Sequence, residues 1–329
     1  MTPRKPTDCS IARKRGKWSC AWRNTNSGGW IVRVYQTTSE NGLNHALLPM
    51  RLYHKAKRLG TWDPKEIDFT QDIEDWQTLD EREQETVLRL CSLFQAGEEA
   101  VTRDLLPLIQ VIAEEGRLEE EMFLTTFLFE EAKHTELFRR VLDEVIGAKG
   151  DLAGWHQENY RKIFYEFLPE AMNRLKEDPS PEAQAEASVT YNMVVEGVLA
   201  ETGYYSFFNG LGRVGKMPGL IKAVHLLRQD ESRHIGYGTY LLSRLVAEHE
   251  QIWEVINRRM GILLPYAIGV VNDTYEGQEE PYPFGMTQEE TVEFSTRQFQ
   301  TRMEVLERAR GRSVEEIFAL SETVVGVEG

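Results

Sequence analysis

The feature that most constrains the fold is helical periodicity that begins near residue 42 and continues almost to the C-terminus. Apolar residues recur there at intervals of three and four, the spacing that places them on one face of a helix. No segment with strand-like alternation competes with this pattern. It predicts one all-α domain over residues 42–310, with main helices near 80–113, 117–146, 153–176, 182–209, 218–246, 249–275 and 287–310.

Charge and composition exclude several classes of function. The chain has 329 residues, with 38 Lys and Arg against 53 Asp and Glu and a net charge of −15. A surface that binds nucleic acid would be basic, so no nucleic-acid partner is expected. No apolar run reaches the roughly 18 residues of a membrane span. Three scattered cysteines (Cys9, Cys20 and Cys91) do not form a disulfide framework, which favours a cytoplasmic protein.

The two ends of the chain differ from this domain. Residues 1–24 hold seven Lys or Arg against a single acid, and no apolar stretch long enough for a secretory signal follows them. We therefore predict a basic, disordered leader over 1–41 and a C-terminal tail over 311–329. An arm that contacts a partner or a lipid is the alternative for the leader.

Two histidines stand out among the seven, because each follows a glutamate by three residues. The pairs are Glu131 with His134, and Glu231 with His234. Residues at i and i+3 share a helix face, so each pair can offer a carboxylate oxygen and an imidazole nitrogen to one ion. A single pair of this kind is expected by chance.

The positions of these pairs strengthen the signal. Glu98, Glu131, Glu196 and Glu231 each fall within an apolar helical stripe and so face the predicted core. A buried carboxylate must be protonated, paired or bound to a metal. Pairing with arginines is the alternative to a metal site here. Glu98 precedes Glu131 by 33 residues and Glu196 precedes Glu231 by 35, so the arrangement repeats.

One Glu from each of two helices, with Glu-x-x-His from each of two others, is the ligand pattern of ferritin-like di-iron and di-manganese proteins. Four carboxylates and two neutral imidazoles carry a charge of −4, which two divalent ions neutralise. Oxygen and imidazole ligands suit iron or manganese, and the lack of a thiolate weakens the case for structural zinc.

At these residues the chain resembles the ribonucleotide reductase small-subunit superfamily, and more closely its ligand-binding oxidase branch. The resemblance extends from about Gly42 to residue 310. It depends on four motifs, which are AGEEAVT around Glu98, FEEAKHTELF around Glu131, SVTYNMVVEG before Glu196 and DESRH around Glu231. It implies a ferritin-like four-helix bundle with additional helices, assembled as a homodimer.

The same resemblance implies a dinuclear centre of one manganese and one iron per chain that reacts with dioxygen, with di-iron also possible. Manganese would be held by Glu98, Glu131 and His134, with Glu131 bridging. Iron would be held by Glu196, Glu231 and His234. Asp230 matches the acid that orients the first histidine.

Two further features separate the branches of this superfamily. Phe138 occupies the position at which reductase subunits carry their radical tyrosine. Val101 and Tyr191 match the pair that oxidases of this branch join by a self-made ether bond. The small residues Ala96 and Gly97 match a channel that holds a long-chain fatty acid in those oxidases.

The function implied is two-electron C–H oxidation by a manganese–iron oxidase on a lipid-like molecule. Three alternatives remain open at this point: a tyrosine-less ribonucleotide reductase small subunit, an acyl-carrier desaturase, and a non-catalytic protein that binds metal and lipid. The C-terminal sequence SETVVGVEG has no tyrosine for radical transfer, which argues against the reductase.

Overall fold

A computed structural model describes residues 10–14, 17–23, 30–33, 35–313 and 316–317. The chain divides into two compact units, Met1–His45 and Ala46–Gly329. No helix in the described ranges combines the length and apolar character needed to span a membrane.

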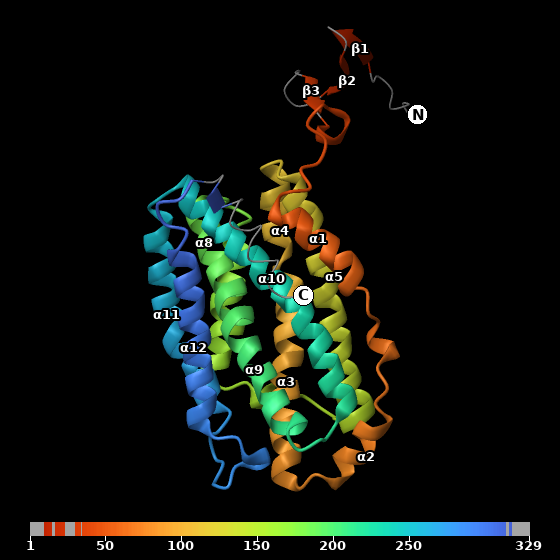
Figure 1. The fold of residues 1–329 in the computed structure, drawn as a ribbon, viewed down its shortest axis with the longest axis vertical. Coiled ribbons are helices and arrows are strands. Elements are labelled where there is room, and N and C mark those ends of the chain that lie inside the picture. The colour runs from red at the N-terminus through yellow and green to blue at the C-terminus, as the bar shows by residue number, and fades with distance from the viewer. Residues whose placement is uncertain (1–9, 15–16, 24–29, 34, 314–315, 318–329) are drawn as a thin grey trace, which may run out of the picture. The chain divides into compact units, whose positions relative to one another are not determined.

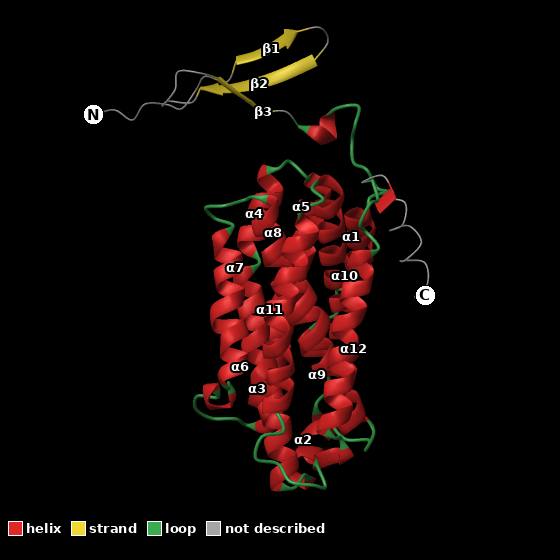
Figure 2. Ribbon diagram, turned by 90° about the vertical axis from the view of Figure 1, so that its left-hand side faces the viewer, coloured by secondary structure: helices red, strands yellow, loops and turns green. Residues whose placement is uncertain are grey.

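The first unit contains a small antiparallel sheet with strand order β1-β2-β3 (Figure 2). Its strands are β1 (Ser10–Lys14), β2 (Lys17–Arg23) and β3 (Trp30–Arg33). These described residues differ from the disordered leader predicted over 1–41. The basic charge of this segment favours disorder, but its Trp, Ile and Val residues favour strands. The rest of that prediction, at 1–9, 15–16, 24–29 and 34, lies outside the described residues.

The second unit is helical (Figure 1). Its α-helices are α1 (Leu48–Leu59), α2 (Thr70–Thr78), α3 (Glu81–Asp104), α4 (Leu106–Glu114), α5 (Leu118–Arg140), α6 (Glu158–Arg161), α7 (Leu168–Arg174), α8 (Pro181–Ser188), α9 (Glu201–Phe207), α10 (Pro218–Glu248), α11 (Ile252–Asp273) and α12 (Gln288–Glu307). Segments of π-helix continue several of them, at Val141–Ile146, Lys162–Phe167, Val189–Ala200 and Phe208–Gly212. Of the tail predicted over 311–329, residues 314–315 and 318–329 lie outside the described residues.

Local sequence explains where two of the long helices begin. Asp80 and Glu83 form a capping box at the start of α3, in which each side chain accepts a hydrogen bond from the other residue's backbone amide. Thr287 and Glu290 do the same at the start of α12. Helices α1 and α2 are additions to the predicted set, because the first helix predicted individually begins near residue 80.

The elements that carry the four core-facing glutamates are neighbours in the fold. Helix α3 packs on α5, α5 packs on α10, and α10 packs on the π-helical segment Val189–Ala200. Helix α1 covers α5 and α10, while α11 and α12 cover the π-helical segment (Figure 1). An extra residue per turn in a π-helix changes which side chains face inward, and such segments often occur at functional sites.

Close packing of α9 on α3 leads to a stability test. A Cβ at Gly203 would lie 2.4 Å from the ring of Phe94, and that ring is stacked on Phe138 at 4.8 Å. We expect Gly203→Ala to lower the free energy of unfolding in urea by about 1–3 kcal/mol. The control is Gly261→Ala on α11, where a Cβ meets no atom within 4 Å and alanine should stabilise by up to about 1 kcal/mol. Equal stability of the two variants would contradict this packing.

Candidate metal centre

The six residues predicted as metal ligands converge in the centre of the bundle. They form two clusters, and the ligand atoms of each lie within 4.8 Å of one another. One cluster is Glu98, Glu131, His134 and Glu231, and the other is Glu131, Glu196, Glu231 and His234. Glu131 is shared, as the resemblance implied. Glu231 is shared as well, which the sequence prediction did not assign.

These side chains are buried, and many of their polar atoms lack a hydrogen-bond partner in the part of the chain that the structure describes. The unpaired atoms are both carboxylate oxygens of Glu131, Oε1 of Glu196, Oε2 of Glu231, and Nδ1 of His134 and His234. The two Nδ1 atoms face carboxylates, at 3.2 Å from Glu231 for His134 and 3.1 Å from Glu131 for His234. Unpaired buried polar atoms are rare in native proteins and call for a missing partner. Oxygen and nitrogen atoms gathered at this spacing fit two metal ions.

The pKa shifts of the clustered side chains also indicate that a positively charged partner is required. Burial raises the pKa of Glu98 to about 8 and that of Glu196 well above the usual carboxyl range. Burial also acts to raise the pKa of Glu131, but the two neighbouring imidazoles outweigh it and lower this pKa to about 2. Burial alone would lower the pKa of His134 and His234, yet the surrounding carboxylates raise both well above the usual histidine value. The cluster therefore needs positive charge, supplied by protons or by cations.

The outer nitrogen of each imidazole contacts a second buried carboxylate. Nε2 of His134 lies 3.2 Å from Asp230, the acid expected to orient this ring. Nε2 of His234 lies 2.9 Å from Glu130, a residue that sequence reasoning missed. The available signal was an acid adjacent to Glu131 in a core-facing helix. Such contacts fix the ring orientation and leave Nδ1 free to bind a metal.

The structure also brings Val101 and Tyr191 together. The buried hydroxyl of Tyr191 donates a hydrogen bond to the backbone carbonyl of Val101 at 3.2 Å. Val101 is buried one turn after Glu98 on α3. Phe138 is fully buried and stacks on Phe94, so the expected radical-tyrosine position has a phenyl ring in an apolar environment.

A cavity of about 150 Å³ reaches the metal cluster. Its lining includes four cluster residues, namely Glu98, Glu131, Glu196 and Glu231. On α3 the lining extends from Thr86 to Val101, about 22 Å of helix axis at 1.5 Å per residue. The cavity is therefore long and reaches the carboxylates at one end.

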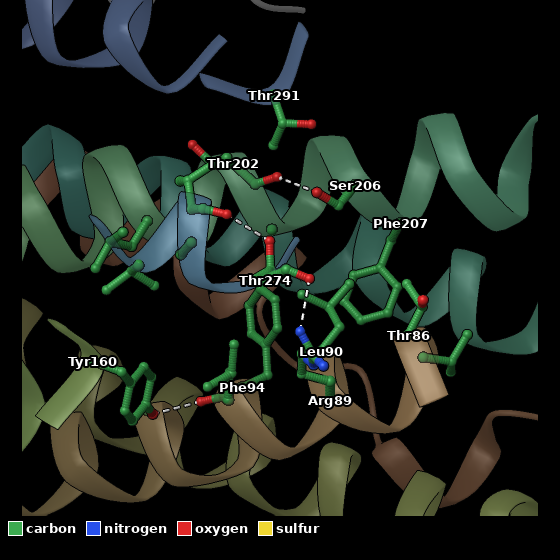
Figure 3. A pocket seen from close by; sticks show the side chains of 18 of the residues that line it. Thr86, Arg89, Leu90, Phe94, Tyr160, Thr202, Ser206, Phe207, Thr274 and Thr291 are labelled. Carbon is green, nitrogen blue, oxygen red and sulfur yellow. Dashed lines mark hydrogen bonds between the residues drawn. The ribbon is translucent and has the colours of Figure 1, made fainter. Parts of the chain in front are cut away.

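The walls of this cavity are mainly apolar. Figure 3 shows Leu90, Phe94 and Phe207 at its side, with Thr86 at one end of the α3 segment. Gly97, one of the two expected channel residues, lines the cavity. Ala96 does not, because it packs against the hydrophobic core on another face of α3. The two neighbours differ because adjacent helical residues point about 100° apart.

Comparison with known proteins places the chain in a family. Residues 50–263 match the family described as ribonucleotide reductase, small chain. An R2-like ligand-binding oxidase with an aerobically reconstituted Mn/Fe cofactor is 41% identical, with a TM-score of 0.79 over 83% of this chain and 96% of that one. A valine-to-alanine variant with an anaerobically reconstituted Mn/Fe cofactor is also 41% identical, with a TM-score of 0.78 over 83% and 97%.

The chain therefore belongs to the ribonucleotide reductase small-chain family, and within it to the R2-like ligand-binding oxidases. This confirms both the resemblance and the all-α, ferritin-like fold predicted from the sequence.

Proposed function

We propose that this protein is a dioxygen-activating oxidase with one manganese and one iron ion per chain. Its ligands are the six clustered residues Glu98, Glu131, His134, Glu196, Glu231 and His234. The observation that carries the proposal is the set of unpaired, buried ligand atoms at the end of an apolar cavity. The similar solved structures hold Mn/Fe cofactors, which favours that pair over two irons.

When bound, the two ions would supply the reduction of dioxygen and the oxidising power for C–H chemistry. The protein's own residues prepare the site for this. Asp230 and Glu130 orient the two imidazoles, and the apolar walls around Phe94 keep bulk water away from the reacting groups.

The ligand that this cavity fits best is a long-chain fatty acid. Its alkyl chain would lie against Leu90 and Phe94, and its carboxylate would lie at the metal end. Two trivalent ions carry +6, which four glutamates, one hydroxide and one fatty carboxylate balance. Neutrality favours this composition, because uncompensated charge is costly in a buried site.

We also assign Val101 and Tyr191 as the residues oxidised by the centre itself. A C–O bond would form between a side-chain carbon of Val101 and the Tyr191 oxygen, with loss of one C–H and one O–H hydrogen. Dioxygen would accept the two electrons released, and the bound ions would supply the redox chemistry for this. The Tyr191 hydroxyl, held 3.2 Å from the Val101 backbone, supports this pairing.

Two further assignments complete the proposal. A homodimer is the expected assembly, and exposed Leu59 on α1 and Phe129 on the adjacent α5 offer apolar surface for it. The cytoplasm is the expected compartment, in keeping with the buried free thiol of Cys91.

Oxygen uptake tests the function. Protein loaded anaerobically with both ions is mixed with oxygenated buffer, excess fatty acid and a chemical reductant, which supplies the two electrons per dioxygen that the C–H bond does not provide. Oxygen and lipid products are followed together. We expect sustained uptake with oxidised lipid. A single round of uptake without lipid product would support the non-catalytic metal- and lipid-binding alternative. No uptake would contradict the oxidase.

A further inference from the structure

The carboxylates behind the two imidazoles form one buried layer. Asp230 contacts His134, and Glu130 contacts His234. The guanidinium of Arg233 donates to both carboxylates. Asp230, Glu130 and Arg233 are at most 3% exposed, so solvent does not screen these contacts.

The two carboxylates are neutralised unequally. Asp230 accepts further hydrogen bonds from Lys133 at 3.0 Å and from the indole of Trp62 at 2.9 Å. The Lys133 ammonium also lies 4.1 Å from the centroid of the Trp62 ring. Among the described residues, the side-chain oxygens of Glu130 accept hydrogen bonds from only His234 and Arg233. Asp230 thus contacts two cations and Glu130 one.

This difference is fixed by the fold at the end of α1. Lys133 donates a second hydrogen bond to the carbonyl of Gly60 at 2.6 Å, which holds the ammonium beside Asp230. A Cβ at Gly60 would lie 1.8 Å from the Glu130 carboxylate and 2.8 Å from Arg233. The glycine therefore lets α1 close tightly over this layer.

The asymmetry affects the two metal positions differently. An imidazole that donates its outer N–H to a carboxylate becomes a stronger metal ligand. A carboxylate already engaged by two cations polarises the ring less than one engaged by a single cation. His234 should therefore be the stronger nitrogen donor of the two.

We propose that Glu130 is a positioning residue that directs iron to the Glu196–His234 site, while the more neutralised Asp230 leaves the Glu98–His134 site tolerant of manganese. Divalent iron binds nitrogen and oxygen ligands more tightly than manganese does, and a stronger imidazole donor increases that preference. This inference rests on the proposed manganese–iron centre and gives a cause for the order of its ions.

Anomalous diffraction at the manganese and iron absorption edges tests it by measuring the occupancy of each ion at each site. Crystals are loaded anaerobically with equal manganese and iron. In Glu130→Gln the amide keeps its shape and loses its charge. We expect the ratio of iron to manganese at the Glu196–His234 site to fall about tenfold, within the usual range for a residue that supports a ligand. Occupancy of the other site should change little.

A second variant should change the ratio of iron to manganese in the opposite direction. Lys133→Gln removes a cation from Asp230, so the Glu98–His134 site should gain iron at the expense of manganese. The control is Glu136→Gln, an exposed carboxylate on the same helix. Unchanged occupancies in Glu130→Gln, or the same change at both sites in both variants, would overturn the inference. Wild-type protein without ions at these residues would instead overturn the proposed function.

Discussion

Replacing Glu131 by glutamine should empty both metal positions at once. The residue belongs to both clusters, and neither of its carboxylate oxygens has a hydrogen-bond partner among the described residues. Glutamine has nearly the same volume, so the fold should persist while one negative charge and one shared ligand are lost. We expect metal content after anaerobic loading and gel filtration to fall at least about tenfold for both ions.

Two matched variants make this result specific. Glu98 belongs to one cluster only, so Glu98→Gln should mainly affect the ion held with His134. Glu136→Gln, five residues after Glu131 and exposed, should bind both ions normally. Retention of both ions in Glu131→Gln, with wild-type stability, would show that the shared carboxylate does not hold the centre.

Filling the cavity at Gly97 should strongly weaken lipid binding and leave the metals in place. A Cβ at this position has room, since its nearest neighbour is the Phe164 ring at 3.4 Å. A leucine side chain would extend into the cavity of about 150 Å³. We expect Gly97→Leu to contain at least about tenfold less fatty acid after purification, a loss of roughly 1.4 kcal/mol in binding. Extraction and mass spectrometry measure this directly.

The matched control places leucine at an open glycine far from the cavity. Gly261 on α11 has no atom within 4 Å of an added Cβ, so Gly261→Leu should retain its lipid. Metal analysis of both variants separates loss of ligand from loss of the centre. Wild-type lipid content in Gly97→Leu would contradict the cavity as the lipid site.

Much of the architecture follows from short-range sequence patterns. Core-facing glutamates could be found because burial of charge conflicts with an apolar stripe, as at Glu196 and Glu231. Helices α1 and α2 lie within the region of helical periodicity, but they are short, and only the longer helices from residue 80 onward were predicted individually. The π-helical segment Val189–Ala200 could not be predicted, since its extra residue per turn is imposed by tertiary packing.

Contacts between distant residues were the least accessible to sequence reasoning. The pairing of Glu130 with His234 joins residues 104 positions apart, and nothing local indicates it. The same holds for Glu231 as a second shared carboxylate, which depends on how α5 and α10 face each other. Gly97 lines the cavity and its neighbour Ala96 does not, because consecutive residues of a helix point to different faces.

The most direct test of the account combines metal analysis with peptide mass spectrometry, after anaerobic loading with both ions and exposure to air. We expect about one manganese and one iron per chain, with a loss of two hydrogens in a cross-linked pair of peptides containing Val101 and Tyr191. Tyr191→Phe should lack this change. Two ions without the mass change would contradict the self-oxidation and favour a tyrosine-less reductase subunit or a desaturase. The absence of bound ions would contradict the metal centre itself.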